Sequence, residues 1–185
     1  MLNILAIIGV IAVVGVAGVL IYAATLPKDF SVSRSIAINA PPEKIFPLIN
    51  DLKRFNEWNP FAKQDPTMVI AYDGPPSGKG AGYSWDSKGK AGKGSSGITD
   101  AAPPSRINMR LDMEKPMEGH PSIVFTLEPK GTATEVCWTM AGPHPYINRI
   151  FGVVFNMDKM IGGAFAGGLA DLKALAENQA VSEID

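Results

Sequence analysis

Several segments of the chain alternate apolar and polar residues in the way that a half-buried β-strand does. In residues 30–39 (FSVSRSIAIN), Phe30, Val32, Ile36 and Ile38 share one side, and small polar residues occupy most of the other. Further strands are predicted at residues 68–74, 81–88, 105–114, 122–131 and 132–142. The inward apolar positions of the last three are Ile107, Met109, Leu111, Met113, Ile123, Phe125, Leu127, Val136, Trp138 and Met140. One-sided alternation in consecutive strands indicates an antiparallel meander with one covered face.

A helical pattern follows the first strand. The segment APPEKIFPLINDLKRFNEWNPF has a proline at a helix start, and its apolar residues Ile45, Leu48, Ile49 and Leu52 share one face. Pro47 must therefore lie in the first helical turn or break the segment. Two short helices are predicted here.

The longest helical pattern lies near the C-terminus, in a helix predicted from about Tyr146 to Asn178. Within it, MDKMIGGAFAGGLADLK (residues 157–173) repeats apolar residues at helical spacing. Each of its internal glycines costs about 0.5–1 kcal/mol relative to alanine. These glycines are Gly162, Gly163, Gly167 and Gly168. They permit a close approach of the helix to a sheet, or they leave a cavity beneath it.

Two glycine-rich segments, GKGAGYSW and GKAGKGSSG, have the composition of phosphate-binding loops. They lie between strands and lead into no helix, so a hairpin with bulges is the better interpretation. The predicted fold is α+β: a curved antiparallel sheet of about seven strands wrapped round a long C-terminal helix, with the two short helices after the first strand. One such domain spans residues 28–178, and a tail of residues 179–185 follows it.

The N-terminal segment has a different composition, because residues 4–26 contain no charged side chain. As a helix they would extend about 34 Å, enough to cross a hydrocarbon core of about 30 Å. A cleaved signal peptide is the alternative, but residues 1–3 carry no Lys or Arg and the apolar run exceeds the usual signal-peptide core. We therefore expect residues 1–27 to be a retained single-pass anchor, in a bacterial inner membrane. Lys28, Arg34 and Lys44 follow the span and favour a cytoplasmic domain.

Charge and composition exclude several classes of site. The formal net charge of −1 gives no electrostatic footprint for nucleic acid. His120, His144 and Cys137 are too few for a zinc-type site and leave no intrachain disulfide, so neither a metal nor a cofactor is expected. The oligomeric state has no signal in the sequence.

The chain resembles the SRPBCC superfamily, also called START-like or helix-grip proteins, in its polyketide cyclase/dehydrase-like branch with an N-terminal membrane anchor. Four segments carry the resemblance: SRSIAINAPPEKIFPLINDLKRFNEWNPF, YDGPPSGKGAGYSWDSKGKAGKGSSGIT, TATEVCWTMAG and MDKMIGGAFAGGLADLK. It implies a cavity between sheet and C-terminal helix that holds an apolar or amphipathic small molecule. Superfamily members serve lipid transfer, hormone binding or polyketide cyclisation, so the fold does not fix the function.

Aromatic and methionine side chains on inward faces or at the sheet edge are the candidate ligand-binding residues, since such side chains suit an adaptable apolar cavity. They are Trp58, Tyr72, Tyr83, Trp85, Met109, Phe125, Trp138, Met140, Met157, Ile161 and Phe165. For any one of them, an ordinary place in the core is the alternative interpretation.

Candidates for acid or base catalysis are few. His120 and His144 lie in proline-flanked loops, and Arg34 shares the inward side of its strand, where it enters the cavity or pairs with a carboxylate. Asp65 and Asp86 fall near the predicted cavity mouth. The outer face of the predicted strand at residues 105–114 is expected to carry Arg110, Asp112 and Glu114.

The sequence therefore predicts a membrane-anchored binding protein for a hydrophobic or lipid-like small molecule, and it favours binding over catalysis. One alternative is a polyketide cyclase or dehydrase that acts in the same cavity, which would need a buried ionisable group there. The other is a protein-interaction module with a solid core and an exposed apolar patch.

Overall fold

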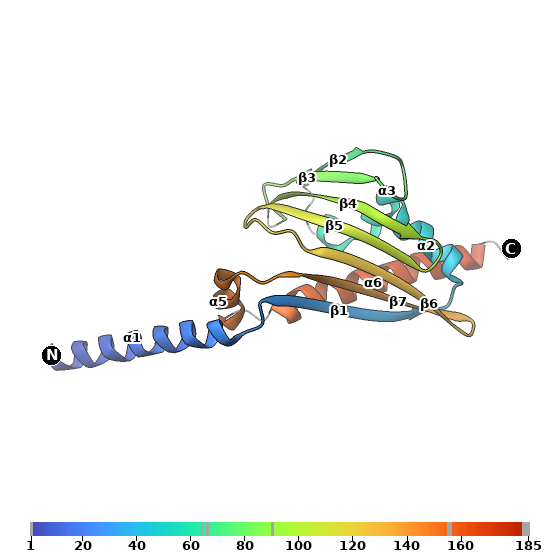
Figure 1. Cartoon of the computed structure of the whole chain (residues 1–185). Coiled ribbons are helices and arrows are strands. Elements are labelled where there is room, and N and C mark those ends of the chain that lie inside the picture. The colour runs from blue at the N-terminus through green and yellow to red at the C-terminus, as the bar shows by residue number, and fades with distance from the viewer. Residues whose placement is uncertain (1, 64, 66, 90, 155–156, 183–185) are drawn as a thin grey trace.

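The computed structural model describes residues 2–63, 65, 67–89, 91–154 and 157–182. Its helices are α1 (Leu2–Thr25), α2 (Pro42–Asn50), α3 (Leu52–Trp58), α4 (Pro60–Lys63), α5 (Tyr146–Val154) and α6 (Met157–Ser182). Its strands are β1 (Asp29–Ile38), β2 (Val69–Asp73), β3 (Gly82–Asp86), β4 (Lys93–Ala102), β5 (Arg106–Lys115), β6 (Ser122–Lys130) and β7 (Ala133–Pro143). Figure 1 shows α1 extending away from a body in which α6 lies along the sheet.

All seven strands form one antiparallel sheet in the order β1-β7-β6-β5-β4-β3-β2. The first and last strands in sequence therefore lie side by side, with Asp29 opposite Pro143 and Ile38 opposite Thr134. The side chains alternate along β1 as the sequence predicts, and Val32 and Ile38 are buried. The α+β helix-grip architecture predicted from the sequence is confirmed.

Strand β4 lies in a segment whose glycine-rich sequence predicts a hairpin connection. Gly94 pairs with Trp85 of β3 on one side and with Met113 of β5 on the other. A Cβ atom at Gly94 would lie 2.7 Å from Cζ2 of the Trp85 indole, so this strand position has no room for a side chain. The expected irregularity is present, since the register of β4 against β5 shifts after Lys93 and after Ile98.

Pro47 departs from its predicted placement. It lies inside α2, where it neither occupies the first turn nor ends the helix. Only the hydrogen bond to the Glu43 carbonyl is lost, and both residues face solvent, so water can satisfy that carbonyl. The helix ends at Asn50, and Asp51 caps α3 by accepting a hydrogen bond from the Lys53 backbone N–H at 2.9 Å.

The predicted C-terminal helix is two helices. Helix α5 packs against α1, whereas α6 packs against β1, α2 and α4, and extends to Ser182. Figure 1 shows α5 at the end of the sheet from which α1 leaves. No proline interrupts residues 146–178, so the sequence does not mark the boundary between the two helices and their different packing partners.

The four glycines of α6 fall into two pairs. A Cβ atom at Gly168 would lie 2.7 Å from Pro60 Cδ and 3.1 Å from Trp138 Cζ3, and one at Gly162 would overlap the Arg34 guanidinium. These two permit close packing. Gly163 and Gly167 are exposed, and a Cβ atom there would meet no other side chain or distant backbone within 4 Å.

Helix α1 contains a stretch from Ala6 to Thr25 that is long and apolar enough to cross a membrane. Only 6% of its most apolar window is buried within the protein. Length and composition alone fit either a membrane anchor or a signal sequence.

Candidate functional site

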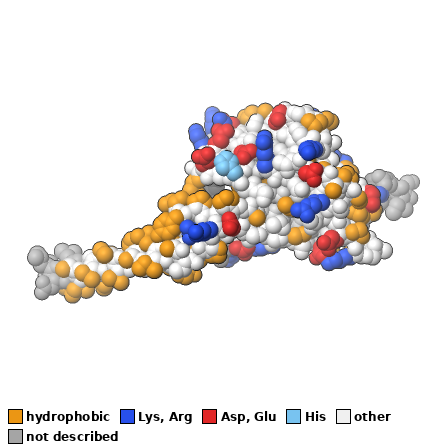
Figure 2. Space-filling model, in the orientation of Figure 1, with side chains coloured by type: hydrophobic (Ala, Val, Ile, Leu, Met, Phe, Trp, Pro, Cys, Tyr) orange, Lys and Arg blue, Asp and Glu red, His pale blue; other side chains and the backbone are white. Residues whose placement is uncertain are grey.

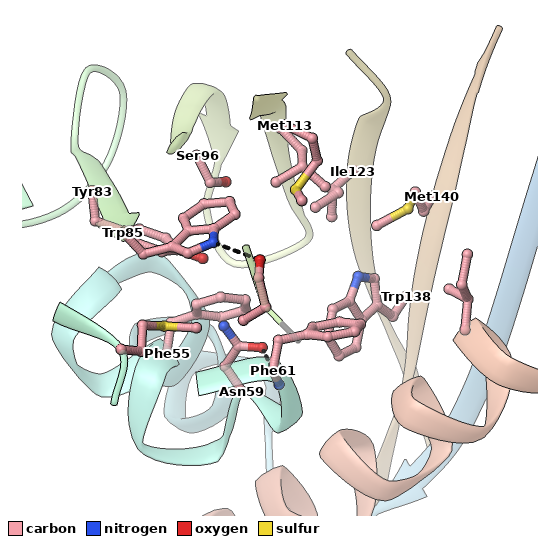
Figure 3. A pocket seen from close by; sticks show the side chains of 14 residues that line it. Phe55, Asn59, Phe61, Tyr83, Trp85, Ser96, Met113, Ile123, Trp138 and Met140 are labelled. Carbon is pink, nitrogen blue, oxygen red and sulfur yellow. Dashed lines mark hydrogen bonds between the residues drawn. The ribbon is translucent and has the colours of Figure 1, made fainter. Parts of the chain in front are cut away.

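A cavity of about 250 Å³ lies between the concave face of the sheet and the helices α3, α4 and α6. Its lining is almost entirely apolar, and Figure 3 shows strand side chains on one side of it and Phe55, Asn59 and Phe61 on the other. The lining residues are Phe55, Asn59, Phe61, Met68, Tyr83, Trp85, Ala91, Ser96, Leu111, Met113, Ile123, Trp138, Met140 and Ile161.

The cavity occupies the end of the sheet from which α1 leaves. On β5 it is lined by Leu111 and Met113, while Met109, further from that end, is fully packed in the core. On β6 the lining residue is Ile123, and Phe125 belongs to the core. The other end of the sheet is filled by apolar side chains from β1, β6, β7, α2 and α6.

A stack of aromatic rings separates the two ends. The Trp138 indole lies parallel to the Phe165 ring, with centroids 4.0 Å apart and an interplanar angle of 8°. Trp58 contacts Trp138 edge-on at 5.6 Å, and its own N–H donates to the Leu48 carbonyl at 2.9 Å. A Cβ atom at Gly168 would lie 3.1 Å from Trp138 Cζ3, so the missing side chain lets α6 approach this stack closely.

Three buried polar residues share part of the lining: Asn59, Tyr83 and Ser96. The Asn59 amide is engaged, since its Nδ2 donates to Asn56 at 2.9 Å and its Oδ1 accepts from the Phe61 N–H at 3.2 Å. The Ser96 hydroxyl donates to the Arg110 carbonyl at 2.8 Å and keeps its oxygen as an acceptor. This part of the cavity can hydrogen-bond a polar group.

Burial dominates the ionisation of Tyr83. Desolvation and the neighbouring Tyr72 raise the pKa of the Tyr83 phenol well above its ordinary value, and hydrogen bonding to Ser96 and Asn59 offsets only part of that rise. The phenol is therefore neutral at physiological pH. It can donate or accept a hydrogen bond, but it is a poor acid.

The two cavity indoles differ in their hydrogen bonding. Nε1 of Trp85 donates to the Ala91 carbonyl at 3.1 Å (Figure 3). Nε1 of Trp138 is buried and has no acceptor in the described part of the structure. In Figure 3 this nitrogen lies on the ring edge nearest to Ile123 and Met140. An unpaired buried donor costs about 1–3 kcal/mol.

Five of the predicted site residues line the cavity: Tyr83, Trp85, Trp138, Met140 and Ile161. Four others are buried in the core beside it: Trp58, Met109, Phe125 and Phe165. Tyr72 is half exposed on β2 and borders a separate groove beside Asp73 and Gly74. The side chain of Met157 lies outside the described residues.

The prediction missed nine lining residues. Leu111, Met113 and Ile123 have the inward parity of their strands, so the signal was present, but parity alone does not say which end of a strand meets the cavity. Ser96 lies in the unrecognised strand β4. Four others come from α3, α4 and the segments next to them, whose packing against the sheet has no local sequence pattern: Phe55, Asn59, Phe61 and Met68. Ala91 comes from the turn between β3 and β4.

The predicted ion pair of Arg34 is present. Its guanidinium donates to both carboxylate oxygens of Asp158, at 2.9 and 3.2 Å, and to the Ser33 carbonyl at 2.7 Å. Hydrogen bonding from Arg34 lowers the pKa of Asp158 below its ordinary value. The pair joins β1 to the first turn of α6, and Arg34 does not line the cavity.

The other charged candidates also lie outside the cavity lining. His120 is exposed, and its Nδ1 lies 2.9 Å from Asp112, which raises the pKa of the imidazole. His144 packs edge-on against Phe30, with ring centroids 6.0 Å apart. Asp86 is exposed on β3.

The Asp65 carboxylate connects two segments of the chain through hydrogen bonds. It accepts hydrogen bonds from the Ser87 and Thr67 hydroxyls and from the Thr67 backbone N–H at 3.0 Å, and these contacts lower its pKa. It joins the segment before β2 to the turn after β3. Within the described residues, no cluster of His, Cys, Asp or Glu side chains could hold a metal ion.

Solved structures of other proteins share this fold. The structure is similar to that of a protein from Chromobacterium violaceum, with a TM-score of 0.57 and 16% identity over 82% of this chain and 99% of the other. A protein from Mesorhizobium loti gives a TM-score of 0.58 at 17% identity, over 80% and 98% of the two chains. The Aha1 dimer from Colwellia psychrerythraea gives 0.56 at 19% identity, over 78% and 93%.

Structural likeness at such low identity supports the fold alone. None of the curated proteins matches the sequence. Residues 29–177 do match the family described as "Polyketide cyclase / dehydrase and lipid transport", and this match covers the whole sheet and nearly all of α6. The chain belongs to that family.

Proposed function

We propose that this protein is a membrane-anchored binding protein for one small, largely apolar molecule, held between the sheet and α6. The carrying observation is the cavity of about 250 Å³ with its apolar lining. A dry apolar cavity of about 150 Å³ is enough to bind benzene, so this one accommodates a larger compound or part of a lipid chain. The family's connection with lipid transport supports the same ligand class.

The buried polar groups favour an amphipathic ligand over a pure hydrocarbon. The Trp138 N–H has no acceptor among the described residues, and the Ser96 oxygen and the neutral Tyr83 phenol lie in the same lining. A carbonyl, ether or hydroxyl oxygen on the ligand would pair with one of these groups. A few polar groups in an apolar pocket usually fix the orientation of a ligand.

The anchor is the second part of the proposal. Helix α1 is long enough to span a bilayer, and α5 of the folded domain hydrogen-bonds to its last turns, which supports a retained segment over a cleaved one. Lys28, Arg34 and Lys44 follow it and favour a cytoplasmic domain.

Binding is favoured over the cyclase or dehydrase alternative by the chemistry of the lining. Among its described residues, the cavity has no Asp, Glu, His, Lys or Arg side chain. Its ionisable group is Tyr83, whose raised pKa makes it a poor acid near neutral pH. The cavity itself also weighs against a solid interaction module.

Native mass spectrometry of the full chain, released from detergent micelles after gentle purification, tests the proposal. We expect a discrete adduct, whose class solvent extraction identifies. The variant Ile161→Trp should lose the adduct because the indole would fill the cavity. Leu175→Trp is a matched control, since it is also half-buried but lies about 21 Å further along α6. A chain that carries no adduct and gains no thermal stability from apolar compounds would contradict binding.

A further inference from the structure

The connection between α1 and the sheet is very short. Helix α1 ends at Thr25 and β1 begins at Asp29, so residues 26–28 span at most about 10 Å. If α1 crosses a bilayer, this end of the sheet cannot move far from the bilayer surface. The cavity lies in the same end of the domain.

Helix α5 is attached to the last turns of α1. The Tyr146 hydroxyl donates to the Leu20 carbonyl at 2.8 Å, and Arg149 Nη1 donates to the Leu26 carbonyl at 3.1 Å and to that of Ala23 at 3.5 Å. Carbonyls at a helix C-terminus lack intrahelical partners and carry partial negative charge, which a guanidinium complements. These bonds place α5 at the depth of residues 20–26, which are the last turns of α1 and the residue after it.

The side chains of α5 at this depth suit a membrane interface. Tyrosine is enriched at the headgroup level, and arginine buries its stem while its charge stays among polar groups. The Arg149 guanidinium also lies over the Tyr146 ring, 5.4 Å from its centroid. Yet Tyr146 remains 41% exposed and Ile147 54% exposed, so the helix presents apolar surface that no described part of the chain covers.

A second apolar residue reaches the same end from the sheet. Met117 is 45% exposed in the loop of residues 116–121, which joins β5 to β6. Ser122, directly after the loop, pairs with Ala141, two residues before the Pro143 that lies opposite Asp29. Figure 2 shows apolar side chains continuing from α1 onto the adjoining part of the body.

We propose that α5 and the 116–121 loop rest in the lipid interface, so that the domain is docked on the bilayer with its cavity end facing the membrane. The partner is the lipid surface in which α1 is inserted. This inference rests on the proposed anchoring function and adds an orientation to it. Docking brings the cavity next to the phase in which an apolar ligand dissolves.

Fluorescent labels on the full chain in phosphatidylethanolamine–phosphatidylglycerol vesicles test the docking. We would use Cys137→Ser as background, because serine can keep the hydrogen bond of Cys137 with Ser33. An environment-sensitive label is placed through Met117→Cys, Ile147→Cys or, as control, Thr132→Cys in the exposed β6–β7 turn at the opposite end. We expect labels at 117 and 147 to shift to shorter wavelength and to be quenched by lipids with spin-labelled acyl chains, whereas the label at 132 stays unquenched.

Flotation of the same vesicles separates the two proposals. Protein that floats and resists alkaline extraction, with quenched labels at 117 and 147, supports both. Protein that floats while these labels behave like the one at 132 overturns the docking and leaves the anchor in place. Protein that does not float overturns the anchor and the docking together.

Discussion

Replacing Gly168 by alanine tests whether this glycine sets the distance between α6 and the stack of aromatic rings. The added Cβ would lie 2.7 Å from Pro60 Cδ and 3.1 Å from Trp138 Cζ3. Both are ring atoms that cannot turn away. Overpacking of this kind costs about 1–3 kcal/mol, against a gain of about 0.5–1 kcal/mol from helix propensity. We expect a net loss of about 1–2 kcal/mol.

The variant Gly167→Ala is the matched control. It makes the same change one residue away, where the Cβ meets no other side chain or distant backbone within 4 Å, so we expect the propensity gain alone. The variant Gly162→Ala falls between them: the Arg34 guanidinium must move, which sacrifices an exposed ion pair with Asp158 worth about 0–1 kcal/mol. Its net effect should be close to zero.

Thermal unfolding of the full chain in detergent, followed by near-ultraviolet circular dichroism, reports this series because packed aromatic rings such as Trp138 dominate the signal, whereas the one aromatic ring of α1, Tyr22, is exposed. One kcal/mol corresponds to about 2–4 °C in a chain of this size. The midpoint should therefore fall by about 2–8 °C for Gly168→Ala and rise by about 1–4 °C for Gly167→Ala. Equal stabilisation by both would refute the close approach at Gly168.

Three further predictions address the cavity and its surroundings. Hydrogen bonds from Ser87 and Thr67 lower the pKa of Asp65, so the stability from these contacts is present above the ordinary carboxyl pKa of 3.8 and is lost as the pH falls through the lowered pKa. Between neutral pH and about pH 3, the melting temperature of Asp65→Asn should therefore fall less steeply than that of the unchanged protein. Parallel curves for the two proteins would contradict this. The variant Trp138→Phe should weaken the binding of 1-tetralone about fivefold more than that of tetralin, as measured by displacement of a fluorescent probe. This factor corresponds to one hydrogen bond of about 1 kcal/mol to the tetralone carbonyl. Equal losses of affinity for the two compounds would argue against the indole N–H as a donor. The variant Gly94→Ala should destabilise the fold by about 1–3 kcal/mol and shift the tryptophan emission, because the added Cβ would meet the Trp85 ring. Unchanged emission would show that the Trp85 ring does not rest on this strand.

The strands whose side chains alternate could be predicted from the sequence, and their inward faces were assigned correctly. The missed strand β4 failed for a physical reason. Gly94 has no side chain because the Trp85 indole occupies that space, and Ser96 supplies a polar group to the lining, so the strand has a turn-like composition. Strand propensity was overridden by the shape of the cavity.

The site was predicted only in part for a related reason. Alternation identifies the face of a side chain but not its distance from the end of the sheet, so Met109 and Met113 were indistinguishable although only the second lines the cavity. Residues such as Phe61 and Asn59 enter the lining through the packing of short helices against the sheet. That packing depends on contacts between distant segments, which a local pattern does not contain.

The pairing of β1 with β7 has a mechanical consequence. Strand β1 follows α1 almost directly and pairs with β7 along its full length, from Asp29 opposite Pro143 to Ile38 opposite Thr134. A pulling force on α1 therefore acts parallel to β1 and loads its ladder of hydrogen bonds in shear, so that many bonds resist together. A force directed along α1 would reach the domain through its most extensively bonded edge, and a force probe attached to residue 1 should meet a high rupture threshold there.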